Sequence, residues 1–226
     1  MAAIERTNAP SAERGPAPAA TGVVPVPVLR FPECGGMTQD TSPDTTTAPA
    51  LPLAPGHWAL DPLYSTVGFT VRHLGIAKVR GRFADARADL YIGETAAEVT
   101  VTAEIALASI DTGNTDRDAH TRGAGLLDVE RRPTMTFRST RIFGEGANWA
   151  MEGDVTIGDV TRPVTFAVEF GGVVDSPVDR RKHAGFEARG EIRRGDFGLD
   201  FGAGLLGDVV KVQLDMQFVA PQGQGH

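Results

Sequence analysis

The stretch TVGFTVR, residues 66–72, alternates apolar residues with small or polar ones at every step. Strict alternation indicates a β-strand with one face in an apolar interior and the other in water. Glycine-containing turns separate further stretches of this kind. They occupy residues 86–92, 98–105, 135–137, 149–157, 164–170, 186–192 and 210–218.

We therefore predict an all-β fold, an eight-stranded antiparallel lipocalin-like β-barrel over residues 57–220. Several of the strands exceed the typical length of about 5–6 residues. Long, consecutive, one-sided strands favour a closed barrel because closure removes the exposed sheet edges. A β-sandwich is the alternative, although its strands are usually shorter. The alternation predicts an apolar interior but leaves open whether side chains fill it.

One segment of the barrel region interrupts the pattern. A short helical insertion is predicted near 114–124, with Asn114 or Thr115 as its N-cap and Gly123 or Gly125 at its end. We expect this connection to cover one mouth of the barrel. The pairs Arg117-Asp118 and Arg194…Asp196 are predicted to form ion pairs that fix loops.

Residues 1–56 differ in composition from the rest, because they hold ten of the fifteen prolines and one aromatic residue, Phe31. Such a segment buries too little apolar surface to offset its ordering entropy, so we predict a disordered N-terminal tail. A partner-binding proline-rich arm is the alternative. Met37 could be the natural start of translation. Residues 221–226 are predicted to be a flexible C-terminus.

Charge and composition exclude several partners. The net charge of −7 is spread along the chain without a basic stripe, so nucleic acid is not an expected partner. The single cysteine, Cys34, allows no internal disulfide. Neither a secretory apolar core nor a membrane-spanning stretch is found, and a cytoplasmic location is predicted. No nucleotide-binding fingerprint or nucleophile elbow is present, so we expect neither a cofactor nor an enzyme.

Several motifs in order resemble the YceI-like polyisoprenoid-binding family. They span nearly all of residues 57–219, and the resemblance depends on their number and register rather than on any one of them. The motifs are Trp58-Ala59-Leu60-Asp61-Pro62, 65–75, 79–83, Ser109-Ile110-Asp111-Thr112, 117–120, Leu127-Asp128, 133–137, 153–164, Arg194-Gly195-Asp196-Phe197-Gly198 and Gly207-Asp208-Val209-Val210.

The resemblance implies an extended lipocalin-like barrel around a long tunnel. It also implies an amphiphilic ligand with a long chain: a polyisoprenoid, a polyprenyl quinone or a fatty-acid derivative. A role in carrying or sequestering this lipid follows, and each buried methylene contributes about 0.8 kcal/mol to binding. The bound lipid would be the only ligand expected, and a homodimer is possible.

Candidate ligand-binding residues are those on the inward face of the strands and of the connection. Phe69 and Phe137 are the preferred contacts because they are large, flat and rigid. His73 has the parity of Phe69, and it is predicted to point inward and to donate a hydrogen bond to a head group. The full set is Val67, Phe69, Val71, His73, Ile105, Leu126, Leu127, Met135, Phe137, Val155, Phe166 and Val168.

The alternative is an enzyme acting on a lipid-like substrate through His73, Asp116 and His120. Asp116 and His120 are four residues apart and lie on one face of the predicted helix. If His73 approached them, the three side chains could hold a metal ion or act as acid and base. Acidic residues in a first helical turn also have a plain electrostatic explanation, so no metal site is predicted.

Overall fold

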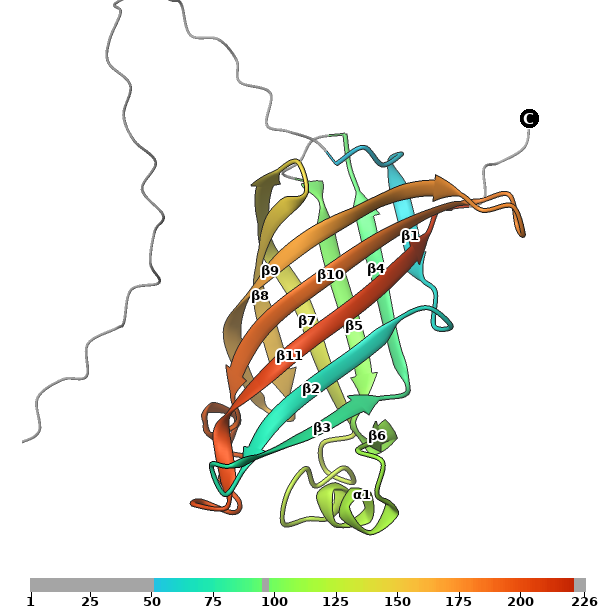
Figure 1. Ribbon diagram of the computed structural model, residues 1–226. Coiled ribbons are helices and arrows are strands. Elements are labelled where there is room, and N and C mark those ends of the chain that lie inside the picture. Colours follow the sequence, from blue (N-terminus) through green and yellow to red (C-terminus); the bar gives the residue numbers. More distant parts are fainter. Residues whose placement is uncertain (1–50, 95–97, 222–226) are drawn as a thin grey trace, which may run out of the picture. The chain divides into compact units, whose positions relative to one another are not determined.

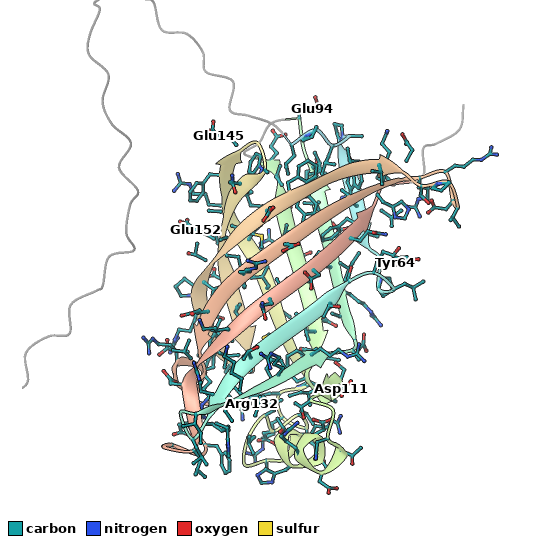
Figure 2. The ribbon with its side chains drawn as sticks, in the orientation of Figure 1. Tyr64, Glu94, Asp111, Arg132, Glu145 and Glu152 are labelled. Carbon is teal, nitrogen blue, oxygen red and sulfur yellow. The ribbon has the colours of Figure 1, made fainter. Side chains whose placement is uncertain are left out.

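The computed structural model describes residues 51–94 and 98–221, which lie within one compact unit. Long strands wind around a single axis, with one short helix at one end (Figure 1). We call this the helix end, and we call the opposite end, where β1 begins, the Trp58 end. In Figure 2, Asp111 and Arg132 mark the helix end, and Glu94 and Glu145 mark the Trp58 end.

Every strand pairing is antiparallel. In chain order the elements are β1 (Gly56–Leu60), β2 (Thr66–His73), β3 (Ala77–Phe83), β4 (Ala86–Ile92), β5 (Thr100–Ala106), the 3-10 helix η2 (Leu107–Ser109), β6 (Ile110–Asp111), α1 (Thr115–Arg122), β7 (Thr134–Glu145), β8 (Asn148–Ile157), β9 (Val160–Asp175), β10 (Lys182–Arg193), the 3-10 helix η3 (Arg194–Phe197) and β11 (Leu206–Val219).

Eight strands close the barrel in the order β1-β4-β5-β7-β8-β9-β10-β11, and β11 returns to β1. The closing contact pairs Ala59 with Val219 and Leu60 with Phe218. Nearer the helix end, β2 takes the place of β1 beside β11. There β3 takes the place of β4 and pairs with β2. The predicted eight-stranded antiparallel barrel is therefore confirmed, with β1–β2 and β3–β4 each forming one interrupted strand.

The interruption between β1 and β2 follows from local sequence. Pro62 lacks a backbone N–H and cannot continue a ladder. The Asp61 carboxylate accepts the Leu63 N–H at 3.0 Å, which turns the chain away from the sheet. The same β11 strand can therefore pair with β2 over residues 206–215 and with β1 at residues 218–219.

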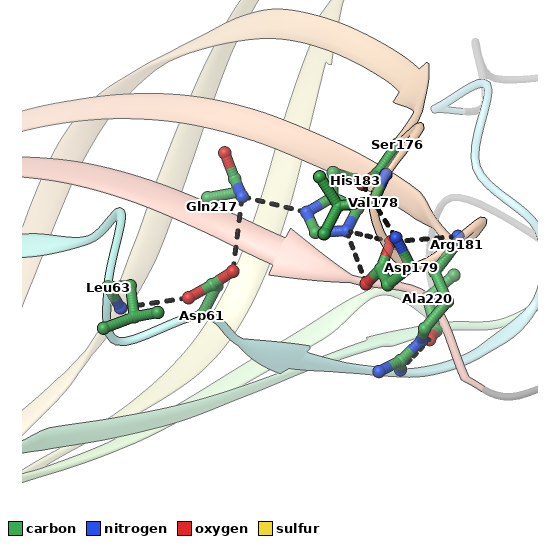
Figure 3. A network of polar contacts seen from close by, with 9 residues as sticks. All are labelled: Asp61, Leu63, Ser176, Val178, Asp179, Arg181, His183, Gln217 and Ala220. Atoms are coloured by element: carbon green, nitrogen blue, oxygen red, sulfur yellow. Dashed lines mark hydrogen bonds and ion pairs between the residues drawn. The ribbon is translucent and has the colours of Figure 1, made fainter.

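A polar network seals the seam where β11 passes from β1 to β2 (Figure 3). The Gln217 carbonyl accepts hydrogen bonds from the Asp61 N–H and from the Ser65 hydroxyl. The Gln217 N–H donates a hydrogen bond to the same hydroxyl. The side-chain amide of Gln217 lies 2.9 Å from His183 Nδ1, and His183 Nε2 lies 3.0 Å from the Asp179 carboxylate. The backbone groups that the seam leaves without strand partners are thus hydrogen-bonded.

The predicted helix near 114–124 is confirmed as α1. Asn114 is its N-cap, with the side-chain oxygen accepting the Arg117 N–H at 2.9 Å, and the helix ends at Gly123. This helix has no apolar face and is held by polar contacts. Asp118 accepts hydrogen bonds from the backbone and hydroxyl of Thr112, and Arg122 donates to the carbonyls of Ala108 and Ile110.

The Trp58 end corrects the predicted start of the barrel at residue 57. Leu51 and Leu53 are buried in the core cluster that surrounds Trp58, which is 0% exposed. The indole N–H of Trp58 donates to the Ala54 carbonyl at 2.9 Å and fixes this segment. Residues 51–56 therefore belong to the barrel rather than to a tail, because their two leucines gain burial that the sequence pattern does not reveal. The remainder of the predicted tail and residues 222–226 lie outside the described residues.

Among the described residues, no helix has the length and apolar character needed to cross a bilayer.

Candidate functional site

The barrel interior contains two apolar cavities. The upper cavity lies toward the Trp58 end and has a volume of about 150 Å³. Its wall is apolar except for Arg87. It is lined by Leu51, Leu60, Val67, Ala86, Arg87, Ala88, Leu90, Val99, Val101, Ala103, Ile105, Met135, Phe137, Ile142, Trp149, Met151, Val155, Phe166, Val168, Phe186, Ala188, Ile192, Val212, Leu214, Met216 and Phe218.

The lower cavity lies toward the helix end and has a volume of about 170 Å³. Its wall joins β2, β3 and β11 to the connections on either side of α1 and to the loop before β11. It is lined by Val67, Gly68, Phe69, Val71, Phe83, Leu107, Ile110, Thr121, Leu126, Leu127, Met135, Ile157, Ile192, Arg194, Leu199, Phe201, Leu206, Val210 and Val212.

Four residues line both cavities: Val67, Met135, Ile192 and Val212. They come from β2, β7, β10 and β11, which all contribute to the barrel wall. The two cavities therefore lie in series along the interior and meet at these four side chains. A long, slender apolar molecule fits this arrangement better than a compact one.

Eleven of the twelve predicted residues line a cavity. Val67 and Met135 line both; Ile105, Phe137, Val155, Phe166 and Val168 line the upper one; Phe69, Val71, Leu126 and Leu127 line the lower one. The alternation rule placed the strand residues correctly because a strand in a closed barrel keeps one parity inside until a bulge shifts it, as between Phe137 and Ile142 of β7. Whether they contact a ligand stays a prediction.

His73 does not follow the prediction. It lies at the last position of β2, is exposed and lines neither cavity. The pairing of β2 with β11 shifts register between Leu206 and Val210, so His73 lies past the regular wall. Inward parity therefore ends before this residue, and the proposed hydrogen bond to a head group has no support from its position.

The alternative acid–base or metal group is not assembled. His120 packs edge-on against Phe201, with ring centroids 5.7 Å apart, and Asp116 is exposed in the first turn of α1. Within residues 51–94 and 98–221, no group of three or more His, Cys, Asp or Glu side chains could hold a metal ion.

Glycines create room for three of the wall rings, those of Phe69, Phe137 and Phe166. Gly81 on β3 pairs directly with Phe69 on β2, and Gly190 on β10 pairs with Phe166 on β9. A Cβ on Gly190 would lie 2.7 Å from the Phe166 ring, and a Cβ on Gly81 would collide with the Phe69 ring. Each ring therefore lies over the backbone of the neighbouring strand instead of extending into the cavity.

Arg194 holds the loop at the mouth of the lower cavity. Its guanidinium donates to the carbonyls of Leu199, Phe201, Leu206 and Gly207. The expected ion pair with Asp196 is not formed. Arg117 likewise donates to Thr112 rather than to Asp118. Both predictions were wrong because carbonyl and hydroxyl oxygens in the loops offer several acceptors to one arginine.

Among the carboxylates of the described residues, Asp111 and Asp179 have perturbed acidities, and both lie outside the cavities. The backbone N–H of Arg181 and the His183 ring lower the pKa of Asp179 to about 2. The Gly113 N–H and the Arg82 guanidinium lower the pKa of Asp111. These groups stabilise turns, and neither faces an apolar wall.

The prediction missed wall residues of two kinds. Leu90, Val101, Phe186 and Leu214 lie on strands and share the inward parity, so the same rule could have found them. The loop residues Leu199 and Phe201 follow no periodicity, and no sequence signal places them at the cavity.

Comparison with known proteins yields one family. A family model described as the YceI-like domain matches residues 58–218. The protein YceI of Escherichia coli O6:H1 (strain CFT073) is 34% identical over 159 residues, which cover 69% of this chain and 82% of that protein.

Solved structures share the fold. The YceI protein of Campylobacter jejuni aligns with a TM-score of 0.60 at 26% identity, over 67% of this chain and 90% of that one. BcnA of Burkholderia cenocepacia aligns with a TM-score of 0.62 at 20% identity, over 70% and 98%. A polyisoprenoid-binding domain from Saccharophagus degradans aligns with a TM-score of 0.55 at 15% identity, over 73% and 98%.

Proposed function

The chain belongs to the YceI-like family, and from this premise we propose that its barrel binds a long-chain amphiphile and carries or sequesters it. The ligand class is a polyisoprenoid, a polyprenyl quinone or a fatty-acid derivative, with the chain inside the barrel. The solved relative from Saccharophagus degradans is described as a polyisoprenoid-binding domain, which supports this class.

The single observation that carries the proposal is the pair of apolar cavities that meet at Val67, Met135, Ile192 and Val212. Each is smaller than the roughly 300–1,000 Å³ typical of pockets for drug-sized molecules. A chain threaded through both uses the whole length of the interior. At about 0.8 kcal/mol per buried methylene, such a chain gains ample free energy without any catalytic group.

The fluorescence of one tryptophan can show whether the barrel holds a ligand. The chain has two tryptophans, and Trp149 lines the upper cavity. A polyprenyl quinone that threads the barrel should therefore quench Trp149 fluorescence. In a Trp58→Phe variant the whole tryptophan signal comes from Trp149. Titration of that variant with a quinone should saturate at one ligand per chain, and solvent extraction of the purified protein followed by mass spectrometry should recover a long-chain lipid.

Two neighbouring substitutions on β11 test whether the quinone binds in the barrel interior or on its surface. Val212 lines both cavities, whereas Gln213 is exposed beside Arg189. Val212→Asp should reduce quinone affinity by at least about tenfold, because an unpaired carboxylate in an apolar wall is costly. Gln213→Asp should leave affinity unchanged. No saturable quenching, together with no extracted lipid, would refute the proposed function. The cytoplasmic location and the homodimer stay predictions.

A further inference from the structure

The helix end carries an exposed apolar tip. Leu74 and Ile76, in the turn between β2 and β3, are 51% and 81% exposed, and Leu205 in the loop before β11 is 53% exposed. The two segments are joined by a hydrogen bond from the Leu74 N–H to the Leu205 carbonyl at 2.7 Å. They lie side by side at the lower left of Figure 1. With the exposed ring of Phe201, these side chains form what we call the apolar tip.

The apolar tip is continuous with the lower cavity. Phe201 belongs to both, and Leu206, which follows Leu205, also lines the cavity. Val71 lines the cavity three residues before Leu74. A molecule that leaves the lower cavity on this side therefore meets apolar side chains before it meets water.

Positive charge lies directly beside the tip. Arg72 on β2 and Lys78 and Arg80 on β3 line an outer groove of about 680 Å³, to which β10 and β11 also contribute. None of the three makes an ion pair with any residue of the described ranges. Arg189 and Lys211 also line the groove, and they pair with Glu187 and Glu191.

The acidic residues near the tip are fewer. Asp200 adjoins Phe201, Asp196 is exposed in η3, and Asp208 is occupied by an ion pair with Arg193 at 3.3 Å. The charge next to the tip is therefore mainly positive, although the whole chain carries a net charge of −7. Global attraction to an anionic surface is thus excluded as an explanation for any binding at this end.

We propose that the helix end docks on an anionic lipid bilayer, with the apolar tip inserted and Arg72, Lys78 and Arg80 against the head groups. Apolar side chains flanked by basic ones are the composition of interfacial membrane anchors. Four side chains on two turns cover much less than the roughly 800 Å² per partner of a stable protein interface, which favours a bilayer over a protein partner. The inference rests on the proposed function, because a bilayer is where a long-chain ligand resides.

Vesicle flotation of the full chain tests the docking. We expect binding to vesicles of equal parts phosphatidylcholine and phosphatidylglycerol, little binding to phosphatidylcholine alone, and weaker binding as salt rises. Ile76→Glu combined with Leu205→Glu should weaken binding at least about tenfold. Lys78→Glu combined with Arg80→Glu should do the same, because each basic residue near an anionic surface contributes about 1 kcal/mol, about fivefold in affinity.

Val178→Glu is the matched control. Val178 is 93% exposed in the β9–β10 turn at the Trp58 end and lines neither cavity. An equal loss of vesicle binding in this variant, or equal binding of the full chain to both vesicles, would overturn the docking. So would absence of binding, or a dimer in light scattering that Ile76→Glu dissolves.

Quinone quenching without vesicles distinguishes the two proposals. Tip variants that keep quenching but lose vesicle binding support the docking. A full chain that binds vesicles but no quinone refutes the proposed function and leaves the docking standing.

Discussion

At the Trp58 end the interior stops against a fully buried indole and two leucines, whereas at the helix end it stops against loops fastened by arginine side chains. Apolar packing of the first kind is dense and resists local opening. Loops held by hydrogen bonds open locally at lower free-energy cost, because water can replace each bond. The difference predicts that the helix end, where the apolar tip also lies, opens more readily than the Trp58 end.

The largest expected effect comes from breaking the packed end. Trp58→Ala should lower the free energy of unfolding by about 3–5 kcal/mol, because it empties the centre of the core cluster. Urea denaturation measures the loss. Trp58→Phe keeps most of the volume but loses the bond to Ala54, and should cost about 1–2 kcal/mol. Similar small losses for both variants would contradict a closure that depends on packing.

Arg194→Ala tests the helix end, where arginine side chains hold the loops in place. It removes four donors to loop carbonyls and should cost roughly 2–3 kcal/mol. Hydrogen exchange should accelerate in residues 199–207 and remain unchanged around Trp58. Arg193→Ala, which breaks only an exposed ion pair with Asp208, should cost less than about 1 kcal/mol. Exchange that accelerates evenly along the barrel would show that Arg194 does not control this end separately.

Substitution of the glycines beneath the wall rings compares the two cavities. Gly190→Ala should push the Phe166 ring into the upper cavity, and Gly81→Ala should push the Phe69 ring into the lower one. Each should cost about 1–3 kcal/mol of stability and weaken quinone quenching of Trp149.

Gly185 supplies the control, because a Cβ there meets nothing within 4 Å. Gly185→Ala should change stability by less than about 0.5 kcal/mol. If all three variants behave alike, the glycines do not provide the room for the rings.

The smallest effect concerns the seam at Gln217. The folded pKa of Asp179 is about 2, below the usual 3.8, so its contribution to stability is present above pH 3.8 and is lost as pH falls through about 2. The stability difference between the wild type and Asp179→Asn should therefore shrink over this window in acid denaturation. A difference that stays constant with pH would mean that the carboxylate charge does not stabilise the turn.

Local sequence was sufficient for the parts of the molecule that repeat. Alternation predicted the closed barrel and nine wall residues on strands, since the regular part of each strand turns one parity inward. Asn114 and Gly123 predicted α1, because capping depends on near neighbours. The family followed from motifs in register.

Only the tertiary structure decided how the interior is shaped and closed. Leu51 and Leu53 follow no period, and their burial depends on Trp58 and on strands far along the chain. The Phe69 and Phe166 rings lie over the neighbouring strands because the register places Gly81 and Gly190 opposite them. His73 lies outside because a register shift with β11 ends the wall before it. These features depend on pairing between distant segments, which local pattern does not contain.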